Sequence, residues 1–537
     1  MNDSKSSAKG DDPYPATNPN VISSEKSVLS YDLFTERFNL MKEQVLVKRP
    51  VLRNVLKKKG NLTLLNYAHG YTDINLNPTI PKRQNDLLQI VFELAEERYG
   101  KDTAWSVLRQ LEKYYFVSTA DHTGPLTHPF FLNSNLLTAA AIVDAKKRLL
   151  NNVIVFSCAN ISFDNSSYPR GLLFHTNGNG IKTHKLSFLK SNPAPCTIYA
   201  SPPYEKDQIN RLLSQLDDKL AAQEIPPEIH VKMKELIKTV YDRDEIYSCK
   251  SYPEQMGKTN AILWKRFFEK SAKKMPNLVC LDMEEIVVKL ITKYHLNEDT
   301  IINHILFDDD YEHYLNTYFE GIFGSFSRQD QKGTYLFWAL PHGKKTNMQL
   351  WKKGRYLVSK DESYKIELTP ENIRDAMARK ELIPGLLLNF ITLSFYYGLK
   401  CIGGFNQINY LTLMKNAYIK MNVDLENYRS IEICARAQTK EMSADGLSLA
   451  ILEDSQNNFS LATGIDLILY GNDKSWSNIM DAAKNVTFEE AISPLMPEIY
   501  NISYEKSELD QNLQQITDRD ILSYTGLQNK IKPVVTI

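Results

Sequence analysis

The chain has 537 residues, too many for a single hydrophobic core, so about two to four folding units are expected. Hydrophobic residues make up 43 % and charged residues 24 %, and 64 Lys and Arg balance 64 Asp and Glu, which leaves no net positive field to drive binding to nucleic acid or an anionic membrane. The polar N-terminus lacks the apolar stretch of a secretory signal, and no apolar run of about eighteen residues exists, which excludes an ordinary membrane-spanning helix.

The six cysteines are widely scattered along the chain and include no Cys-x-x-Cys pair. They are therefore expected to be reduced and mostly buried, as in a cytosolic protein. Together with the charge balance, this pattern predicts a soluble cytoplasmic protein that acts on a small molecule and binds neither nucleic acid nor membrane.

The N-terminal part predicts a polar tail followed by helices. Residues 1–27 are rich in Ser, Asn, Asp and Pro and are expected to be disordered. Residues 48–59 are basic, but they lack interleaved aromatic residues and are interpreted as a solvated helix face rather than a nucleic-acid or membrane patch. Residues 85–99 show helical spacing and end before Gly100, and Asp102 is expected to cap the next helix.

A strand, a glycine-containing loop and a helix follow. Residues 115–118 predict a short strand that leads into the loop HTGPLTH, and a helix is predicted over residues 135–150. In α/β proteins such junctions hold anionic ligands against backbone N–H groups and the positive end of a helix. His122 and His128 are therefore candidates to give hydrogen bonds or positive charge to a phosphate in a transition state. A proline-rich turn whose histidines cap and pack is an equally weighted alternative.

The next segments predict a second strand and a hairpin. Residues 152–157 have the dense β-branched composition of a central parallel strand. Further along, the turn NGNG at residues 177–180 lies between two strand-like runs and predicts a β-hairpin. His175 and His184 flank this turn and are interpreted as cross-strand surface residues rather than ligands.

The middle of the chain is largely helical. Residues 205–275 contain three segments whose apolar residues lie three or four positions apart. Residues 277–282 then predict a buried strand that feeds a helix, as in a unit of a parallel sheet. The acidic residues 308–310 are interpreted as a loop before a helix, and a metal site is the minor alternative.

The second half contains two further loops of interest. Residues 399–402 predict a strand that is followed by a Gly403-Gly404 turn and a helix. Residues 431–435 are interpreted as another strand, followed by the loop TKEMSADG at residues 439–446. In open α/β sheets the loops after the strands converge beyond the carboxyl ends, so the three loops are expected to meet.

These elements predict an α/β protein with a Rossmann-like parallel-sheet core, a helical insertion and added terminal elements. The predicted division of the chain is a tail at 1–27, the first half of the core with N-terminal helices and hairpin at 28–204, the insertion at 205–275, the second half of the core with connecting segments at 276–460, and a C-terminal segment at 461–537.

The first and third loops echo the two signatures of class I aminoacyl-tRNA-synthetase-like nucleotidyltransferases. In that superfamily a His-x-Gly-His loop at a helix start and a late Lys-Met-Ser-Lys-Ser loop embrace the phosphates of ATP. Here His122, Gly124 and His128 are spaced differently from the first signature, and Lys440, Met442 and Ser443 match the second only in part.

Over roughly residues 115–451 the whole arrangement resembles the bacillithiol-biosynthesis cysteine-adding enzyme family. That family has a Thr-Gly-rich loop at a helix start, which TADHTGPLTHPFF resembles in position. It also has a Gly-Gly-Pro-Gly-Glu-Ile-x-Tyr-like motif, to which GGFNQINY is similar. The matching residues of this second motif are Gly403, Gly404, Ile408 and Tyr410.

The chain also departs from the family. Gln407 replaces the motif glutamate, which keeps hydrogen-bonding capacity but loses charge and base function. An acidic and histidine-rich loop of the family is reduced to Asp164 and Asn165, and Asn389-Phe390 replaces an Arg-Pro pair. The resemblance therefore supports the predicted fold more strongly than the predicted reaction.

The resemblance implies a ligase-like enzyme that joins an amino-acid carboxylate to the amine of a small metabolite, with nucleotide activation and ATP as the candidate cofactor. The implied catalytic residues are His122, His128 and Asp164. The implied substrate- or nucleotide-binding residues are Thr123, Gly124, Asn133, Gly403, Gly404, Asn406, Gln407, Tyr410, Lys440 and Ser443. No metal-binding motif is found. Two other functions remain open: a non-catalytic binding or interaction protein on the same fold, and a nucleotidyltransferase. A homodimer is also possible.

Overall fold

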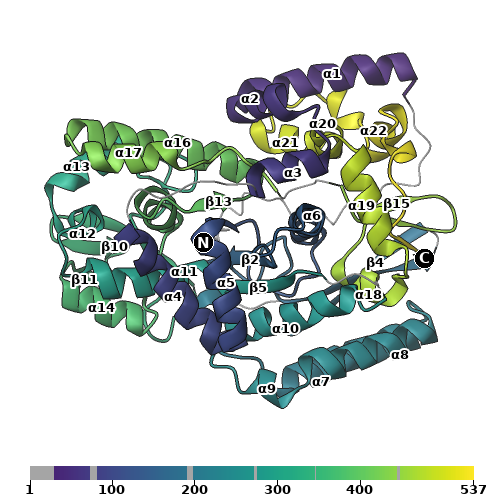
Figure 1. The fold of residues 1–537 in the computed structure, drawn as a ribbon, viewed down its shortest axis with the longest axis horizontal. Coiled ribbons are helices and arrows are strands. Elements are labelled where there is room, and N and C mark those ends of the chain that lie inside the picture. Colours follow the sequence, from purple (N-terminus) through teal and green to yellow (C-terminus); the bar gives the residue numbers. More distant parts are fainter. Residues whose placement is uncertain are drawn as a thin grey trace, which may run out of the picture.

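A computed structural model describes residues 29–72, 81–178, 180–189, 197–270, 275–344, 346–443 and 448–537. The predicted tail 1–27 lies outside these residues. The protein is a mixed α/β structure with a parallel sheet at its centre (Figure 1). Within the described segments, every helix is too short or too polar to cross a membrane.

The central sheet has four strands, all parallel. Its order is β13-β1-β2-β5, so the strand that comes last in the chain lies next to the first. The strands are β1 (Phe116–Ser118), β2 (Asn152–Ser157), β5 (Asn277–Asp282) and β13 (Lys400–Ile402). All four lie where the sequence predicts them, because strands buried on both faces read as continuous apolar runs.

Helices cover both faces of this sheet. Successive side chains of β2 point to opposite sides: Val153 and Val155 join the core that contains α6 (Pro129–Ala145), whereas Ile154 and Phe156 join the core of the other face. That second core is built by α4 (Pro81–Tyr99), α5 (Lys101–Lys113) and α11 (Met283–Leu290). The sheet is thus the middle layer of three.

Two helix starts differ from the prediction. Helix α6 begins at Pro129, before the predicted residue 135, because His128 is its N-cap and Pro129 suits the first helical position. The Nδ1 atom of His128 accepts from the backbone N–H of Phe130 at 3.3 Å. Asp102 does not cap α5, because Gly100, with φ of 85°, both ends α4 and precedes α5.

The insertion is helical, as predicted. Helices α7 and α8 run side by side along one edge of the molecule, and α10 returns the chain to the sheet, where it packs against β5 (Figure 1). The elements are α7 (Lys206–Ala221), α8 (Pro227–Leu236), α9 (Asp244–Tyr247) and α10 (Tyr252–Phe267).

The predicted hairpin is confirmed as β3 (Gly171–Gly178) paired with β4 (Gly180–Ser187). Its histidines, however, are buried, so the surface interpretation is wrong. Helix α18 (Gly464–Tyr470) packs against β3, and Asp466 on it lies 2.6 Å from Nδ1 of His175. Nε2 of His184 lies 2.7 Å from Thr176 Oγ1. A distant segment of the chain therefore encloses one side of the hairpin.

The two ends of the chain pack together. The N-terminal helices contact C-terminal helices, and Figure 1 shows the purple and yellow segments side by side. The basic segment forms α2, whose buried face is apolar, as the interpretation of a solvated helix requires. The N-terminal helices are α1 (Tyr31–Lys48), α2 (Pro50–Lys59) and α3 (Leu64–Thr72). The C-terminal ones are α19 (Ser475–Asn485), α20 (Phe488–Ile492), α21 (Met496–Ser503) and α22 (Asp518–Tyr524).

A second, antiparallel sheet of order β11-β10-β9-β8-β12 lies on the other side of the molecule. It consists of β8 (Phe337–Ala339), β9 (Met348–Lys353), β10 (Tyr356–Ser359), β11 (Lys365–Glu367) and β12 (Leu382–Pro384). The helices around it are α12 (Ile301–Phe307), α13 (Asp310–Phe319), α14 (Pro370–Ala378) and α15 (Leu386–Phe390). Small strands elsewhere are β6 (Phe326–Ser327), β7 (Lys332–Gly333), β14 (Ile451–Glu453), β15 (Phe459–Leu461) and β16 (Val535–Thr536).

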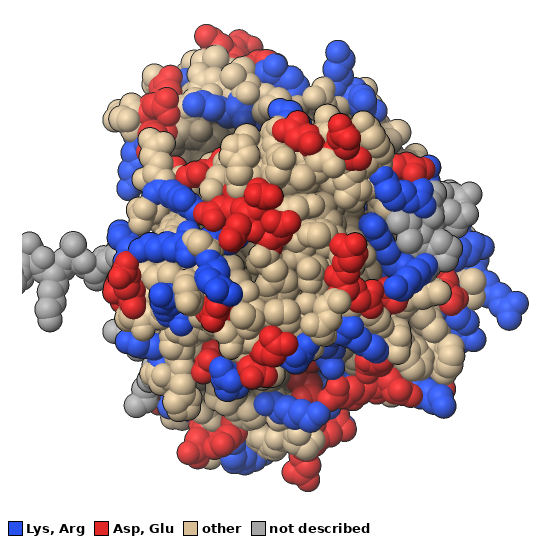
Figure 2. Space-filling model, turned by 90° about the vertical axis from the view of Figure 1, so that its left-hand side faces the viewer, with Lys and Arg blue, Asp and Glu red and all other residues tan. Residues whose placement is uncertain are grey.

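Acidic and basic groups alternate on this side. Figure 2 views the face that carries α13 and α14, and neither charge sign forms a continuous field over it. The acidic residues 308–310 precede or begin α13, as expected, and Asp309 pairs with the buried Lys352 at 2.9 Å. The five cysteines in the described residues form no disulfide, and four of them are buried, while Cys196 lies outside these residues.

The strand predicted over residues 431–435 is wrong. This segment is part of helix α17 (Tyr428–Arg436), which begins after Asn427, whose side chain accepts from the backbone N–H of Ser430 at 3.2 Å. Ile431 and Ile433 alternate as in a strand. The buried residues of the segment are Ser430, Ile433 and Cys434, whose spacing of three and four positions is that of a helix face. The loop TKEMSADG therefore follows a helix.

Candidate functional site

The carboxyl ends of the four parallel strands collect a set of polar side chains. Asp121 and Thr123 follow β1, Asp282 ends β5, and Gln407 lies in the first turn of α16 (Phe405–Asp424), directly after β13. Ser157 is the last residue of β2. Residues from four distant parts of the sequence thus share one edge of the sheet.

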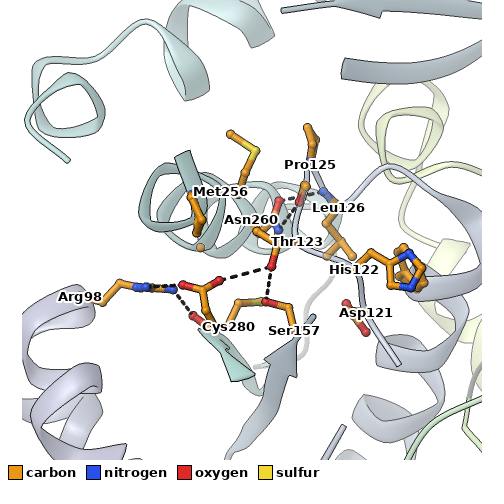
Figure 3. Close-up of a pocket in the computed structure, with 15 residues that line it drawn as sticks. Arg98, Asp121, His122, Thr123, Pro125, Leu126, Ser157, Met256, Asn260 and Cys280 are labelled. Carbon is orange, nitrogen blue, oxygen red and sulfur yellow. Dashed lines mark hydrogen bonds and ion pairs between the residues drawn. The ribbon is translucent and has the colours of Figure 1, made fainter. Parts of the chain in front are cut away.

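A small cavity opens between this edge, the HTGPLTH loop and α10 (Figure 3). The space within it is about 10 Å³, which is room for about one water molecule. Polar side chains that line it include Arg98, Asp121, His122, Thr123, Ser157 and Asp282. The site therefore admits one small polar group rather than a whole metabolite.

A buried ion pair forms one wall of the cavity. Arg98 Nη2 lies 2.7 Å from Asp282 Oδ2 and 3.2 Å from Glu285 Oε2, and Arg98 Nη1 donates to the Cys280 carbonyl at 3.0 Å. The other oxygen of Asp282 lies 3.3 Å from Thr123 Oγ1, which is also 2.9 Å from Ser157 Oγ. Figure 3 draws the contacts of Arg98 with the end of β5 and those of Thr123, which together link α4, β5, β2 and the loop. Both oxygens of Asp282 are therefore engaged.

The backbone of the loop is held by α10. Asn260 Nδ2 donates to the Gly124 carbonyl at 2.8 Å, and Asn260 Oδ1 accepts from the Leu126 N–H at 2.7 Å. A Cβ atom on Gly124 would lie 2.7 Å from Pro169 Cα. Packing of the loop against Pro169 therefore requires glycine at position 124.

The two histidines of the loop are uncharged at neutral pH. Burial lowers the pKa of His122 to about 4, and its Nδ1 lies 3.1 Å from both Asn165 Oδ1 and Ser167 Oγ. Burial, with repulsion from His122 and Lys185, lowers the pKa of His128 to about 3. His122 lines the cavity, whereas His128 caps α6. Neither ring therefore supplies the positive charge that was expected to stabilise a phosphate.

Asp121 is the most unusual group of the site. Its side chain is only 5 % exposed, and Oδ2 accepts from Asn135 Nδ2 at 2.8 Å. Oδ1 is buried and has no hydrogen-bond partner among the described residues. Burial raises the pKa of Asp121 to about 7, which is the range of a general acid or base at neutral pH. Asp121 was not among the predicted site residues, although its position shortly after a predicted parallel strand was a signal for it.

A second buried carboxyl group, that of Glu284, lies on α11, the helix that follows β5. Glu284 accepts from the Ala159 N–H at 2.9 Å, from Asn389 Nδ2 at 3.3 Å and from the Cys158 thiol at 3.5 Å. Burial raises the pKa of Glu284 to about 7. Unlike Asp121, this carboxyl group has partners on both oxygens, so it fastens the ends of β2 and β5 to α15. It was also missed, because it lies inside a predicted amphipathic helix.

The second loop joins β13 to β1. Gln407 Nε2 donates to Thr119 Oγ1 at 2.7 Å and to the Cys401 carbonyl at 3.3 Å. A Cβ atom on Gly403 would lie 2.0 Å from Gln407 Oε1, so Gly403 makes room for this amide. Gly404 is the N-cap of α16. The amide that replaces the family glutamate thus serves as a brace between two strands.

The described part of the third loop is hydrogen-bonded to the same edge of the sheet. The Ser443 N–H donates to the Gly403 carbonyl at 3.0 Å, and Ser443 Oγ lies 2.9 Å from Ser134 Oγ on α6. The Met442 N–H donates to the Tyr67 hydroxyl at 2.8 Å. Lys440 is exposed. These hydrogen bonds hold Met442 and Ser443 to the edge of the sheet and to α3, and residues 444–446 lie outside the described residues.

The remaining candidates lie apart from the cavity. Asp164 is exposed and pairs with Arg170 at 2.7 Å. Asn133 braces α6, since its Nδ2 donates to the Pro129 carbonyl and its Oδ1 accepts from Leu449 and Ala450 N–H groups. Asn406 and Tyr410 are buried on α16. Of the predicted residues, only His122, Thr123 and Gly124 are among the described residues that line the cavity.

Comparison of the chain with known protein families finds no family model that matches, and comparison with curated proteins finds no match.

Proposed function

We propose that the protein is a ligase-like enzyme that joins an amino-acid carboxylate to the amine of a small metabolite on a Rossmann-like core. The observation that carries this proposal is the buried, half-unpaired Asp121 at the carboxyl edge of the parallel sheet. An amine is protonated at neutral pH and must lose a proton before it can attack an acyl carbon. A carboxylate with a pKa near 7 is suited to take that proton.

The order of the strands supports a site at this edge. With the strands numbered along the chain, the order is three, two, one, four, and the direction of winding reverses between β1 and β13. Ligands of doubly wound sheets bind beyond the carboxyl ends at such a point. Helices α6 and α16 both begin there, so their positive ends face this edge.

His122 would serve as a neutral hydrogen-bond acceptor in this scheme. Its ring lines the cavity, and its Nδ1 donates to Asn165 Oδ1, so Nε2 of the neutral imidazole carries no proton and can accept an N–H of the amine. Thr123 and Ser157 would orient the small group that enters the cavity.

The cavity does not fit ATP, the nucleotide that would activate the carboxylate. A nucleotide does not fit a cavity of about 10 Å³, and both loop histidines are neutral. Gln407 and Ser443 are engaged in internal hydrogen bonds. No chemical step is therefore assigned to the nucleotide, which would have to lie outside the loops.

These same contacts favour a second candidate, a small-molecule-binding protein without turnover. The two candidates are separated by incubating the purified protein with ATP, a mixture of amino acids and a panel of primary amines, and measuring AMP and ADP. The enzyme releases a nucleotide product only when both acid and amine are present. Thermal stabilisation by amino acids or nucleotides with no release identifies the binding protein, because ligands that bind the native state raise its stability. If the protein shows neither thermal stabilisation nor nucleotide release, the proposal is overturned.

A further inference from the structure

We infer that the cavity beside Asp121 is a receptor for a primary ammonium group, –NH₃⁺ or NH₄⁺. The inference rests on the proposed function only where it identifies this group with the amine that reacts. The hydrogen-bond balance of the cavity, its size and its charge all point to such a group.

The hydrogen-bond balance favours a ligand that donates. Arg98 is used by Asp282, Glu285 and the Cys280 carbonyl, and the Asn260 amide is used by the loop backbone. The Thr123 hydroxyl has oxygen partners as well. The group left over is an acceptor, Asp121 Oδ1, and Figure 3 draws no interaction from Asp121 to the other lining residues. A buried acceptor without a partner is costly, so the cavity calls for an N–H or O–H donor and not for an anion.

The size of the cavity limits the ligand to one heavy atom. About 10 Å³ holds a water molecule, an ammonium ion or the terminal –NH₃⁺ of a longer amine. A carboxylate, a phosphate or a guanidinium group has several heavy atoms around one centre and is too large. A longer amine would enter by its nitrogen and leave its carbon chain outside.

The charge balance separates ammonium from water. Two carboxylates line the cavity. Asp282 pairs with Arg98 at 2.7 Å, whereas the side-chain partner of Asp121 is the neutral amide of Asn135. With Asp121 ionised, its negative charge has no cation paired with it among the described residues. Water would satisfy Oδ1 but leave this buried charge, whereas a monovalent cation that donates hydrogen bonds satisfies both.

The reaction step that follows from this placement is a proton transfer. Asp121 Oδ1 accepts one N–H of the ammonium group, the N–H bond breaks and an O–H bond forms on Asp121. The nitrogen keeps the electron pair and becomes a neutral amine that can attack an acyl carbon. The proton that leaves the amine is the only group transferred, and no further reactant is needed.

The test compares three chloride salts at equal ionic strength and pH 8: ammonium, methylammonium and tetramethylammonium. Thermal unfolding is followed for the parent, for Asp121→Asn, and for the matched control Asp375→Asn, which changes an exposed Asp on α14. We expect ammonium and methylammonium, but not tetramethylammonium, to raise the melting temperature of the parent and of the control, and we expect Asp121→Asn to lose this response.

The two sources of the group give different results. Stabilisation by ammonium alone identifies free ammonium as the ligand, and stabilisation that extends to methylammonium identifies the amino end of a metabolite. With a pKa of about 7 for Asp121, the apparent affinity should be about tenfold higher at pH 8 than at pH 6. The titratable neighbours of Asp121 are His122, which stays neutral in this range, and Cys280, whose pKa burial raises well above its usual range; Arg98 and Asp282 are held as an ion pair.

Equal stabilisation by all three salts, or an unchanged response in Asp121→Asn, would overturn the inference. If Asp121→Asn does not fold, Asp121→Glu replaces it, because the added methylene keeps the charge but fills a cavity of one-water size and should also abolish the response. A nucleotide or amino acid that stabilises the parent while ammonium ions do not would refute this inference and leave the proposed function standing.

Discussion

Replacement of Asp121 by Asn should change how the stability of the protein depends on pH. The side chain is 5 % exposed, and burial raises its pKa from 3.8 to about 7. The folded state therefore holds the proton more tightly than the unfolded state. The carboxyl group has no effect on stability below about pH 4, becomes unfavourable as the pH rises from about 4 to about 7, and keeps its full cost above that.

At 1.36 kcal/mol per pH unit, this pKa difference corresponds to a cost on the order of 4 kcal/mol above pH 7, of which roughly 2–3 kcal/mol develops between pH 5 and pH 8. Asn has nearly the same shape and does not ionise. The free energy of unfolding of Asp121→Asn relative to the parent should therefore rise by about that amount from pH 5 to pH 8. All other titrating groups, Glu284 included, are shared and cancel in the comparison.

The assay is urea unfolding followed by circular dichroism, in buffers free of ammonium and amines, because a bound cation would offset the cost. Parent and variant are measured at pH 5, 6, 7 and 8. A difference between the two proteins that stays constant over this range would refute the reasoning, since it would mean that Asp121 titrates normally and that its carboxyl group is solvated.

Three further predictions concern the braces around the site. Gln407→Ala removes the hydrogen bonds from its amide to Thr119 and to the Cys401 carbonyl and should cost about 1–3 kcal/mol, and Gly403→Ala should cost a similar amount through the clash with Gln407. In the double variant the two costs should not add, and urea unfolding of all three variants checks this. His175→Ala leaves the buried Asp466 without its ring partner and should cost about 3–5 kcal/mol in the same measurement; a loss below about 1 kcal/mol would show that the pair is not buried as described. His122→Ala should keep the melting temperature within a few degrees but lower the rate of amine-dependent nucleotide release by about 10²-fold, because the ring that positions the amine is lost, whereas a protein that melts early would indicate a structural role.

Elements that depend on local sequence were predicted well. The four parallel strands, the hairpin and the helical insertion appear where hydrophobic periodicity indicates them. Such patterns record which faces a segment buries, and the central strands bury both. The error at residues 431–435 arose because Ile431 and Ile433 fit two periodicities, and only the cap at Asn427 decides between them.

Features that depend on distant contacts were not predictable. His175 is buried because Asp466, almost three hundred residues later, packs on the hairpin. The cavity exists because α10 comes back to the HTGPLTH loop through Asn260. Asp121 has a raised pKa because segments distant in the sequence bury it, and its Oδ1 has no partner among the described residues; sequence spacing records neither. The motif predicted His122, which lines the cavity, but the group of the site that can carry an unpaired charge is the carboxyl group of Asp121 beside it.

The central claim, that this edge of the sheet joins a carboxylate to an amine, can be tested by oxygen transfer. Amino acids labelled with ¹⁸O in the carboxylate are incubated with ATP, primary amines and the protein, and the released AMP or phosphate is analysed by mass spectrometry. The account predicts one ¹⁸O atom in the released AMP or phosphate when an amine is present, and loss of amine-dependent release in Asp121→Asn. Release of unlabelled AMP or phosphate only, or no release with any amine, would contradict it.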